Sequence, residues 1–265
     1  MKSLLRVLAV LCLVGSPQAF AQETASDEAA AGGEEPDARA LMLASAEFLA
    51  AQPAFAFGWF VSYDEPVDGR EMITYLISGR TTMKRDAGFF SETERGDTLR
   101  SYYYDGEVFT LASPDQNFYA EAAFDRGFDA LIEAVEQRTG TVLPLWSIMS
   151  PTLPERLERG TANAAYLGRT LLAGNWTHHL AFADEREDWQ IWIADNDAEP
   201  LPLLIIGTNT RVQGWPQYRA HLVNWDLAPE TEPSDFVFQP DEDDQIVSMP
   251  SLIAAGPTAA TGGTE

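Results

Sequence analysis

The sequence contains one cysteine, Cys12, in 265 residues. This cysteine lies inside an N-terminal apolar segment that we expect to be removed, so the mature chain should contain none. A chain without cysteine forms no disulfide and offers no thiolate for catalysis or metal binding. At this length a hydrophobic core can stabilise the fold without cross-links.

Basic residues are also scarce, with 17 lysines and arginines against 41 acidic residues and a formal net charge of −24. A surface of this charge repels phosphate backbones and anionic lipid head groups. The composition therefore argues against nucleic-acid binding and against membrane binding through a basic patch. We interpret the acidic surface as one that keeps an exported protein soluble.

Signatures of catalysis are missing. The sequence has no Gly-x-Ser-x-Gly or Ser-x-x-Lys motif, no glycine-rich phosphate loop and no dinucleotide fingerprint. The acidic residues form too many pairs for a catalytic pair to be ranked. The residues at 195–199 resemble the start of a calcium loop, but Pro200 and Ile206 stand where that loop needs glycine and glutamate. These observations favour a non-catalytic protein without a cofactor.

Histidine occurs three times, at His178, His179 and His221. Adjacent side chains on a strand point to opposite faces, so His178 and His179 cannot readily bind one ion. A zinc site needs three or four convergent ligands. A periplasmic hydrolase or metal-dependent enzyme that uses His179, His221 and an acid remains an alternative function.

The N-terminus has the pattern of a secretory signal peptide. Lys2 and Arg6 precede an apolar run over residues 7–14, and the small residues Ala19 and Ala21 flank Phe20 before the expected cleavage site. The apolar run is shorter than the roughly 20 residues that span a bilayer. We therefore assign residues 1–21 to a signal peptide and expect a periplasmic or secreted protein without a stable membrane anchor.

Two further segments are predicted to be disordered. Residues 22–36 form an acidic leader rich in alanine and glycine, and residues 250–265 form a similar tail. The sequence between them contains no obvious linker. We expect residues 37–249 to form a single domain.

Hydrophobic periodicity within that domain predicts an α+β fold. Helices are expected at residues 37–52, 124–139, 143–149 and 154–158. Strands are expected at 55–63, 71–80, 82–91, 97–104, 107–113, 164–173, 176–183, 189–194, 201–208, 218–226 and 236–238. The short connections favour antiparallel pairing. Asp105-Gly106 suits a two-residue turn that would place Tyr102 opposite Phe109.

Short motifs in a fixed order give the sequence a family resemblance. They lie at 103–106, 117–120, 128–140, 143–145, 166–168, 179–182, 188–193, 200–202 and 216–226. In this order they resemble a family of predicted bacterial periplasmic proteins catalogued as a domain of unknown function. Its pattern often has a cysteine and an aspartate where this sequence has Thr177 and His178, so no role of that cysteine carries over.

That family looks similar in architecture to the outer-membrane lipoprotein carriers (LolA-like). The resemblance implies a strongly curved antiparallel sheet, an incomplete β-barrel, with helices covering its concave face. It also implies that the hollow binds acyl chains of lipoproteins or other lipids. The expected function is that of a periplasmic binding or carrier protein for a hydrophobic ligand, without a cofactor.

Alternating apolar residues of the strands and the apolar 143–149 segment supply candidates for the cavity lining. They are Phe55, Phe57, Trp59, Leu145, Trp146, Ile148, Met149, Trp189, Ile191 and Ile193. Stripes of this kind are more often a core packed under helices than the lining of an open cavity. A third possible function is an envelope scaffold that binds another protein through an exposed Trp146 or Trp215. The sequence does not set the oligomeric state.

Overall fold

The structure is a computed structural model that describes residues 35–67, 71–139, 144–160, 163–183 and 188–249. The predicted signal peptide (1–21), most of the predicted leader and the predicted tail (250–265) lie outside the described residues. One compact unit begins at Glu35. Within the described residues, no helix has the length and apolar character needed to cross a bilayer.

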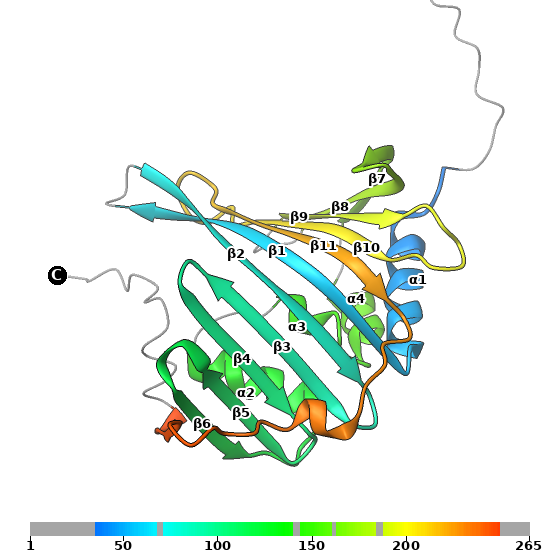
Figure 1. Ribbon diagram of the computed structural model, residues 1–265. Helices are drawn as coiled ribbons and strands as arrows, with labels where there is room; N and C mark the ends of the chain where they lie inside the picture. Colours follow the sequence, from blue (N-terminus) through cyan, green and yellow to red (C-terminus); the bar gives the residue numbers. More distant parts are fainter. Residues whose placement is uncertain (1–34, 68–70, 140–143, 161–162, 184–187, 250–265) are drawn as a thin grey trace, which may run out of the picture. The chain divides into compact units, whose positions relative to one another are not determined.

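A twelve-stranded sheet organises this unit (Figure 1), in the order β12-β6-β5-β4-β3-β2-β1-β11-β10-β9-β8-β7. Its first half contains β1 (Ala54–Val67), β2 (Glu71–Lys84), β3 (Gly88–Arg95), β4 (Thr98–Tyr104), β5 (Val108–Ser113) and β6 (Phe118–Ala123). Its second half contains β7 (Asn163–Leu172), β8 (Asn175–Ala183), β9 (Asp188–Ala194), β10 (Pro202–Thr208), β11 (Gln217–Asp226) and β12 (Gln245–Ile246). All neighbours pair antiparallel except β12, which pairs parallel to β6. The predicted α+β class and antiparallel pairing are confirmed.

The expected strong curvature is wrong. The sheet is open, with β12 and β7 at its two edges, and it is not strongly curled into an incomplete barrel. β1 and β2 pair over their whole length, from Ala54 opposite Lys84 to Val67 opposite Glu71, without a bulge. Bulges bend a sheet, and the β1–β2 ladder has none; β1 has a register shift only on its other side, between Ala56 and Gly58 in its pairing with β11.

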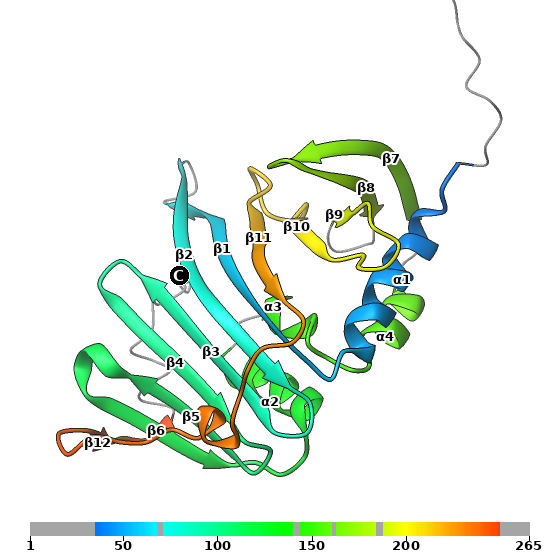
Figure 2. The same cartoon turned by 45° about the vertical axis from the view of Figure 1, so that its right-hand side comes forward.

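Four helices accompany the sheet: α1 (Ala38–Ala51), α2 (Phe128–Thr139), α3 (Pro144–Ser147) and α4 (Leu153–Gly160). Figures 1 and 2 show α2 and α3 against β3–β5, and α1 with α4 near β7–β10. The predicted N-cap of α1 is confirmed, because the Asp37 carboxylate accepts a hydrogen bond from the main-chain N–H of Arg39. α2 begins four residues later than predicted because Gly127 adopts a left-handed conformation with φ 84°.

The predicted β4–β5 register is wrong by two residues. Phe109 lies opposite Tyr104 instead of Tyr102. The Asp105 carboxylate accepts hydrogen bonds from the main-chain N–H groups of Glu107 and Val108. The connection between the two strands therefore has three residues, 105–107, instead of the expected two.

The expected strand at 236–238 is wrong. Residues Pro233–Phe236 form a 3₁₀ turn, η2, next to β3, and residues 237–238 belong to no strand. β6 was not predicted. The expected break at residue 81, between the predicted strands 71–80 and 82–91, is absent, because β2 continues to Lys84. An added Cβ on Gly79 would lie 2.5 Å from Cζ2 of Trp59, so the glycine makes room for that ring.

Candidate ligand-binding site

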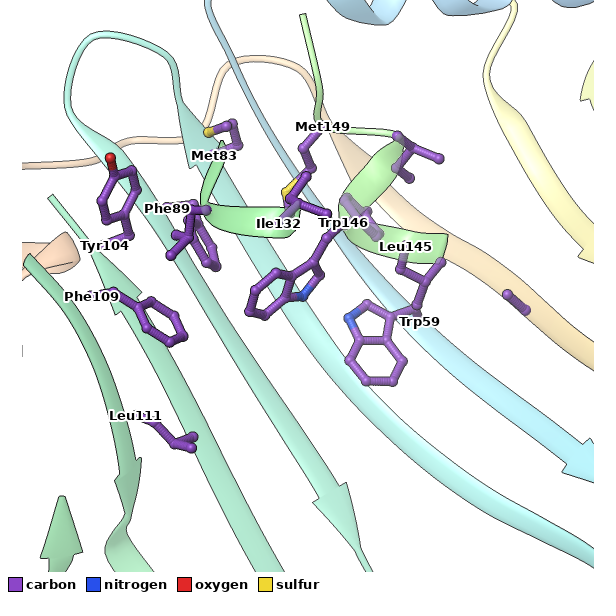
Figure 3. Close-up of a cluster of buried hydrophobic side chains, with 14 of the residues drawn as sticks. Trp59, Met83, Phe89, Tyr104, Phe109, Leu111, Ile132, Leu145, Trp146 and Met149 are labelled. Atoms are coloured by element: carbon purple, nitrogen blue, oxygen red, sulfur yellow. The ribbon is translucent and has the colours of Figure 1, made fainter. Parts of the chain in front are cut away.

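The larger hydrophobic cluster lies between the helices and one face of β1–β5 (Figure 3). Alternate residues of each strand point to this face. The strands contribute Phe55, Phe57, Trp59, Val61, Met83, Phe89, Tyr104, Phe109 and Leu111. From the helical side come Leu131, Ile132, Leu145, Trp146, Ile148 and Met149. This face of the sheet is therefore aromatic and is covered by a short helical layer.

Trp146 is the central side chain of that cover. Its ring meets Phe89 at 5.0 Å, Tyr102 at 5.2 Å and Phe109 at 6.2 Å between ring centroids, each in an edge-on arrangement. Figure 3 shows the Trp146 ring directed toward the strands. Edge-on contacts of this kind are favourable beyond the area that they bury. We call residues 144–149, which carry Trp146, the cover segment.

A single arginine anchors the end of the cover segment. The Arg85 guanidinium donates hydrogen bonds to the main-chain oxygens of Leu49, Gln52 and Met149 at 2.8, 2.8 and 3.0 Å. Burial lowers the pKa of Arg85, and Asp129 opposes this. The cover segment is thus tied by a charged donor to the C-terminal end of α1.

The sheet face under the cover also contains buried hydroxyl groups. The indole N–H of Trp59 donates to Thr81 Oγ1 at 3.1 Å, and Thr81 Oγ1 lies 2.9 Å from Ser91 Oγ. These contacts fix the Trp59 ring across β2 and satisfy its only polar group. The face therefore combines aromatic rings with a few oriented polar atoms, as ligand sites commonly do.

A smaller cluster lies on the same face of the sheet under α1. Its buried members are Ala38, Met42, Leu180, Phe182, Ile191 and Ile193, with Trp189 partly buried against them. Ile205 of β10 packs against both clusters and connects them.

The structure divides the predicted lining residues between these two clusters. It brings seven of them together in the larger cluster, namely Phe55, Phe57, Trp59, Leu145, Trp146, Ile148 and Met149. It places Trp189, Ile191 and Ile193 in the smaller cluster. The seven are buried core side chains in this structure.

Sequence reasoning missed a group at the periphery of the larger cluster. Tyr63 and Tyr75 lie opposite each other on β1 and β2, with their rings stacked at 5.6 Å. The Arg95 guanidinium lies 4.9 Å from the centre of the Tyr75 ring and 5.8 Å from that of Tyr63. Tyr218 packs nearby, and burial raises the pKa of its phenol. The alternation of apolar residues along β1 placed Tyr63 on this face. Arg95 was missed because the predicted strand ended at residue 91, whereas β3 extends to Arg95.

The histidines do not form a common site. His221 lies opposite Leu204, Leu204 lies opposite Trp192, and Trp192 lies opposite His179. Three strand spacings thus separate the two histidines by about 14 Å. The expectation that His179 and His221 share a site is wrong, because β9 and β10 intervene. Among the described residues, no group of three or more His, Cys, Asp or Glu side chains could hold a metal ion.

Each histidine instead has a local partner. The His178 ring bridges Tyr166 Oη at 3.1 Å and Asp195 Oδ1 at 3.0 Å. His179 Nε2 lies 2.9 Å from Gln190 Oε1, and its ring stacks on Trp192 at 4.0 Å. The His221 ring stacks on Phe60 at 4.2 Å.

The scaffold alternative requires an exposed tryptophan. Trp146 is only 6% exposed and is unavailable to a partner protein in this structure. Trp215 is 64% exposed in the connection between β10 and β11. A role for Trp215 as an anchor stays a prediction.

Comparison with known proteins identifies one family. The sequence model of the family described as "Predicted periplasmic protein (DUF2092)" matches residues 38–249. No curated protein matches the chain.

Several solved structures are similar at low identity. An uncharacterized conserved protein from Thermus thermophilus is 9% identical with a TM-score of 0.46, over 79% of this chain and 98% of its own. LprF from Mycobacterium bovis is 11% identical with a TM-score of 0.47, over 76% and 97%. A LolA superfamily protein from Nitrosomonas europaea is 9% identical with a TM-score of 0.37, over 77% and 99%. These likenesses are too distant to indicate a ligand.

Proposed function

The chain belongs to the DUF2092 family of predicted periplasmic proteins, and we propose that it binds or carries a hydrophobic ligand, such as the acyl chain of a lipid or lipoprotein. In this proposal the ligand replaces the cover segment against the aromatic face of β1–β5. Binding consists of partition of hydrocarbon onto that face, and no covalent step is involved.

The observation that carries the proposal is the position of Trp146 on a helix of only four residues. A helix this short is unstable by itself, since helix formation in water needs many more residues. Its position therefore depends on the insertion of its side chains and on the hydrogen bond from Arg85. The cover segment can leave without unfolding any strand of the sheet.

The energies involved make such an exchange feasible. Burial of Leu145, Trp146, Ile148 and Met149 stabilises the closed state by about 1.5–3 kcal/mol per side chain, or roughly 6–12 kcal/mol together. An acyl chain with roughly 12–16 methylenes gains about 0.8 kcal/mol per buried methylene, or roughly 10–13 kcal/mol. A ligand of that length compensates for displacement of the cover, whereas a much shorter one does not.

The test measures uptake of a fluorescent fatty acid by the purified mature protein, together with mass spectrometry of co-extracted lipids. Trp146→Ala removes the central ring of the cover and leaves a space of its size. We expect this variant to bind the probe several-fold more tightly than the wild type, although the protein itself loses about 3–5 kcal/mol of stability.

Trp215→Ala provides the matched control because it removes an exposed tryptophan far from the cover in sequence. We expect it to bind the probe as the wild type does. Circular dichroism establishes that each variant is folded, and Trp146→Leu replaces Trp146→Ala should the latter unfold. The absence of both co-extracted lipid and probe binding in the folded wild type and Trp146 variants would overturn the proposal.

A further inference from the structure

Arg95, the last residue of β3, has a nitrogen that lacks a hydrogen-bond partner. Its Nη1 atom is buried and makes no hydrogen bond within the described part of the chain. A buried guanidinium N–H group without an acceptor is unfavourable by the full cost of its desolvation. An acceptor from outside the described residues would satisfy this atom.

The surroundings of Arg95 are aromatic. The guanidinium lies over the paired rings of Tyr63 and Tyr75, at 5.8 and 4.9 Å from their centres. These cation–π contacts hold the planar group in place without using its N–H donors. Tyr63 and the neighbouring Ile77 also pack against the larger cluster that the cover segment closes. Arg95 is therefore a cation next to the proposed apolar site.

The charges around Arg95 leave it available to a single anion. β3 and β4 place two arginines on this face, and the other one, Arg100, already bonds to Ser113 and pairs with Asp115 at 3.5 Å. Burial raises the pKa of the Tyr63 phenol; Arg95 opposes this rise and Glu65 adds to it, with the Arg95 effect the larger. Arg95 therefore acts more strongly on the Tyr63 phenol than Glu65 does.

We propose that Arg95 binds the carboxylate of a single-chain anionic amphiphile, a long-chain fatty acid, whose tail occupies the aromatic face under the cover segment. This inference rests on the proposed function and specifies its ligand class. The single positive charge of the Arg95 guanidinium matches one negative charge, which a carboxylate carries and a phosphate monoester exceeds. The strongly acidic protein otherwise repels anions, so the site supplies the attraction that the rest of the surface lacks.

The experiment compares hexadecanoate, a long-chain fatty acid, with its uncharged methyl ester as competitors of a fluorescent apolar probe at pH 7.5, where the acid is ionised. We expect the wild type to bind the acid about tenfold or more tightly than the ester, as expected for hydrogen bonds to a charged group. Arg95→Met, which keeps an apolar side chain on the tyrosine rings, should lower this ratio to about one by weakening acid binding alone.

Arg80→Met is the matched control. Arg80 lies on the opposite face of β2, its side chain is 66% exposed, and it pairs with Glu92. We expect this variant to keep the wild-type ratio.

The outcomes separate the two proposals. Equal binding of acid and ester by the wild type, or an unchanged ratio in folded Arg95→Met, overturns the carboxylate site and leaves the apolar site standing. Failure of both acid and ester to bind any variant overturns the proposed function itself. Should Arg95→Met not fold, the ratio of acid to ester affinity is compared between the wild type and Arg95→Lys, which keeps the charge. Both proteins should prefer the acid, and equal binding of acid and ester by the wild type overturns the carboxylate site.

Discussion

The Arg85 guanidinium donates its Nη1 hydrogen bond to the main-chain oxygen of Met149 at 3.0 Å. The same group binds the main-chain oxygens of Leu49 and Gln52 at the end of α1, and it lies 5.9 Å from the centre of the Phe55 ring. One side chain therefore bonds to main-chain carbonyl groups at the end of α1 and to the last residue of the cover segment.

Replacement of Arg85 by methionine should destabilise the protein by about 2–5 kcal/mol, because three main-chain acceptors lose a charged donor at once. Urea unfolding measures this change. Arg80→Met removes an exposed arginine and should stay within about 0.5 kcal/mol of the wild type. Equal stability of the two variants would show that the hydrogen bonds of Arg85 do not stabilise the folded protein.

Gly79→Ala should be destabilising by about 1–3 kcal/mol or more. An added Cβ would lie 1.9 Å from the main-chain oxygen of Glu92 and 2.5 Å from Trp59, so β2 and β3 must separate or the indole must move. The midpoint of thermal unfolding measures the effect, with Ser78→Ala as the exposed neighbour for comparison. A Gly79→Ala midpoint equal to that of Ser78→Ala would contradict the close packing of Trp59 on β2.

His221 should make stability depend on pH below neutrality. Burial lowers the pKa of His221 in the folded protein, whereas an unfolded histidine titrates near 6.5. As the pH falls below about 6.5, the unfolded chain takes up a proton that the folded chain resists. The free energy of unfolding therefore decreases, and this contribution is fully present only above that pH.

His221→Phe, which keeps a ring next to Phe60, should remove this part of the pH dependence. Urea midpoints at pH 7.5 and 5.5 for both proteins test it, since His178 and His179 are common to both. The wild type should lose more stability than the variant between the two values. Equal losses would mean that the His221 ring is as easily protonated in the folded chain as in the unfolded one.

The sequence was sufficient to predict several local features of the fold. The alternation of Phe55, Phe57 and Trp59 identified both a strand and its buried face, and Asp37 marked the start of α1. The apolar 143–149 segment identified the cover of the site. These features depend on neighbours within one element, which periodicity reports directly.

Long-range features could not be predicted in the same way. Trp189, Ile191 and Ile193 share a sheet face with Trp59. The strand order, however, separates their strand β9 from β1 by β10 and β11, so these three residues lie in the smaller cluster under α1. The separation of His179 from His221 follows from that same order. The curvature also depends on bulges, whose positions the hydrophobic pattern does not encode. The orphaned nitrogen of Arg95 becomes visible only once its neighbours in space are known.

Hydrogen–deuterium exchange of the cover segment tests most directly whether a ligand displaces it. The mature protein is labelled with and without a saturating long-chain fatty acid, and the amides of residues 145–149 are compared with those of β1 and β2. We predict faster exchange at 145–149 on ligand binding, with the strand amides unchanged or slower. A ligand that binds while these amides stay as protected as before would contradict a site beneath Trp146.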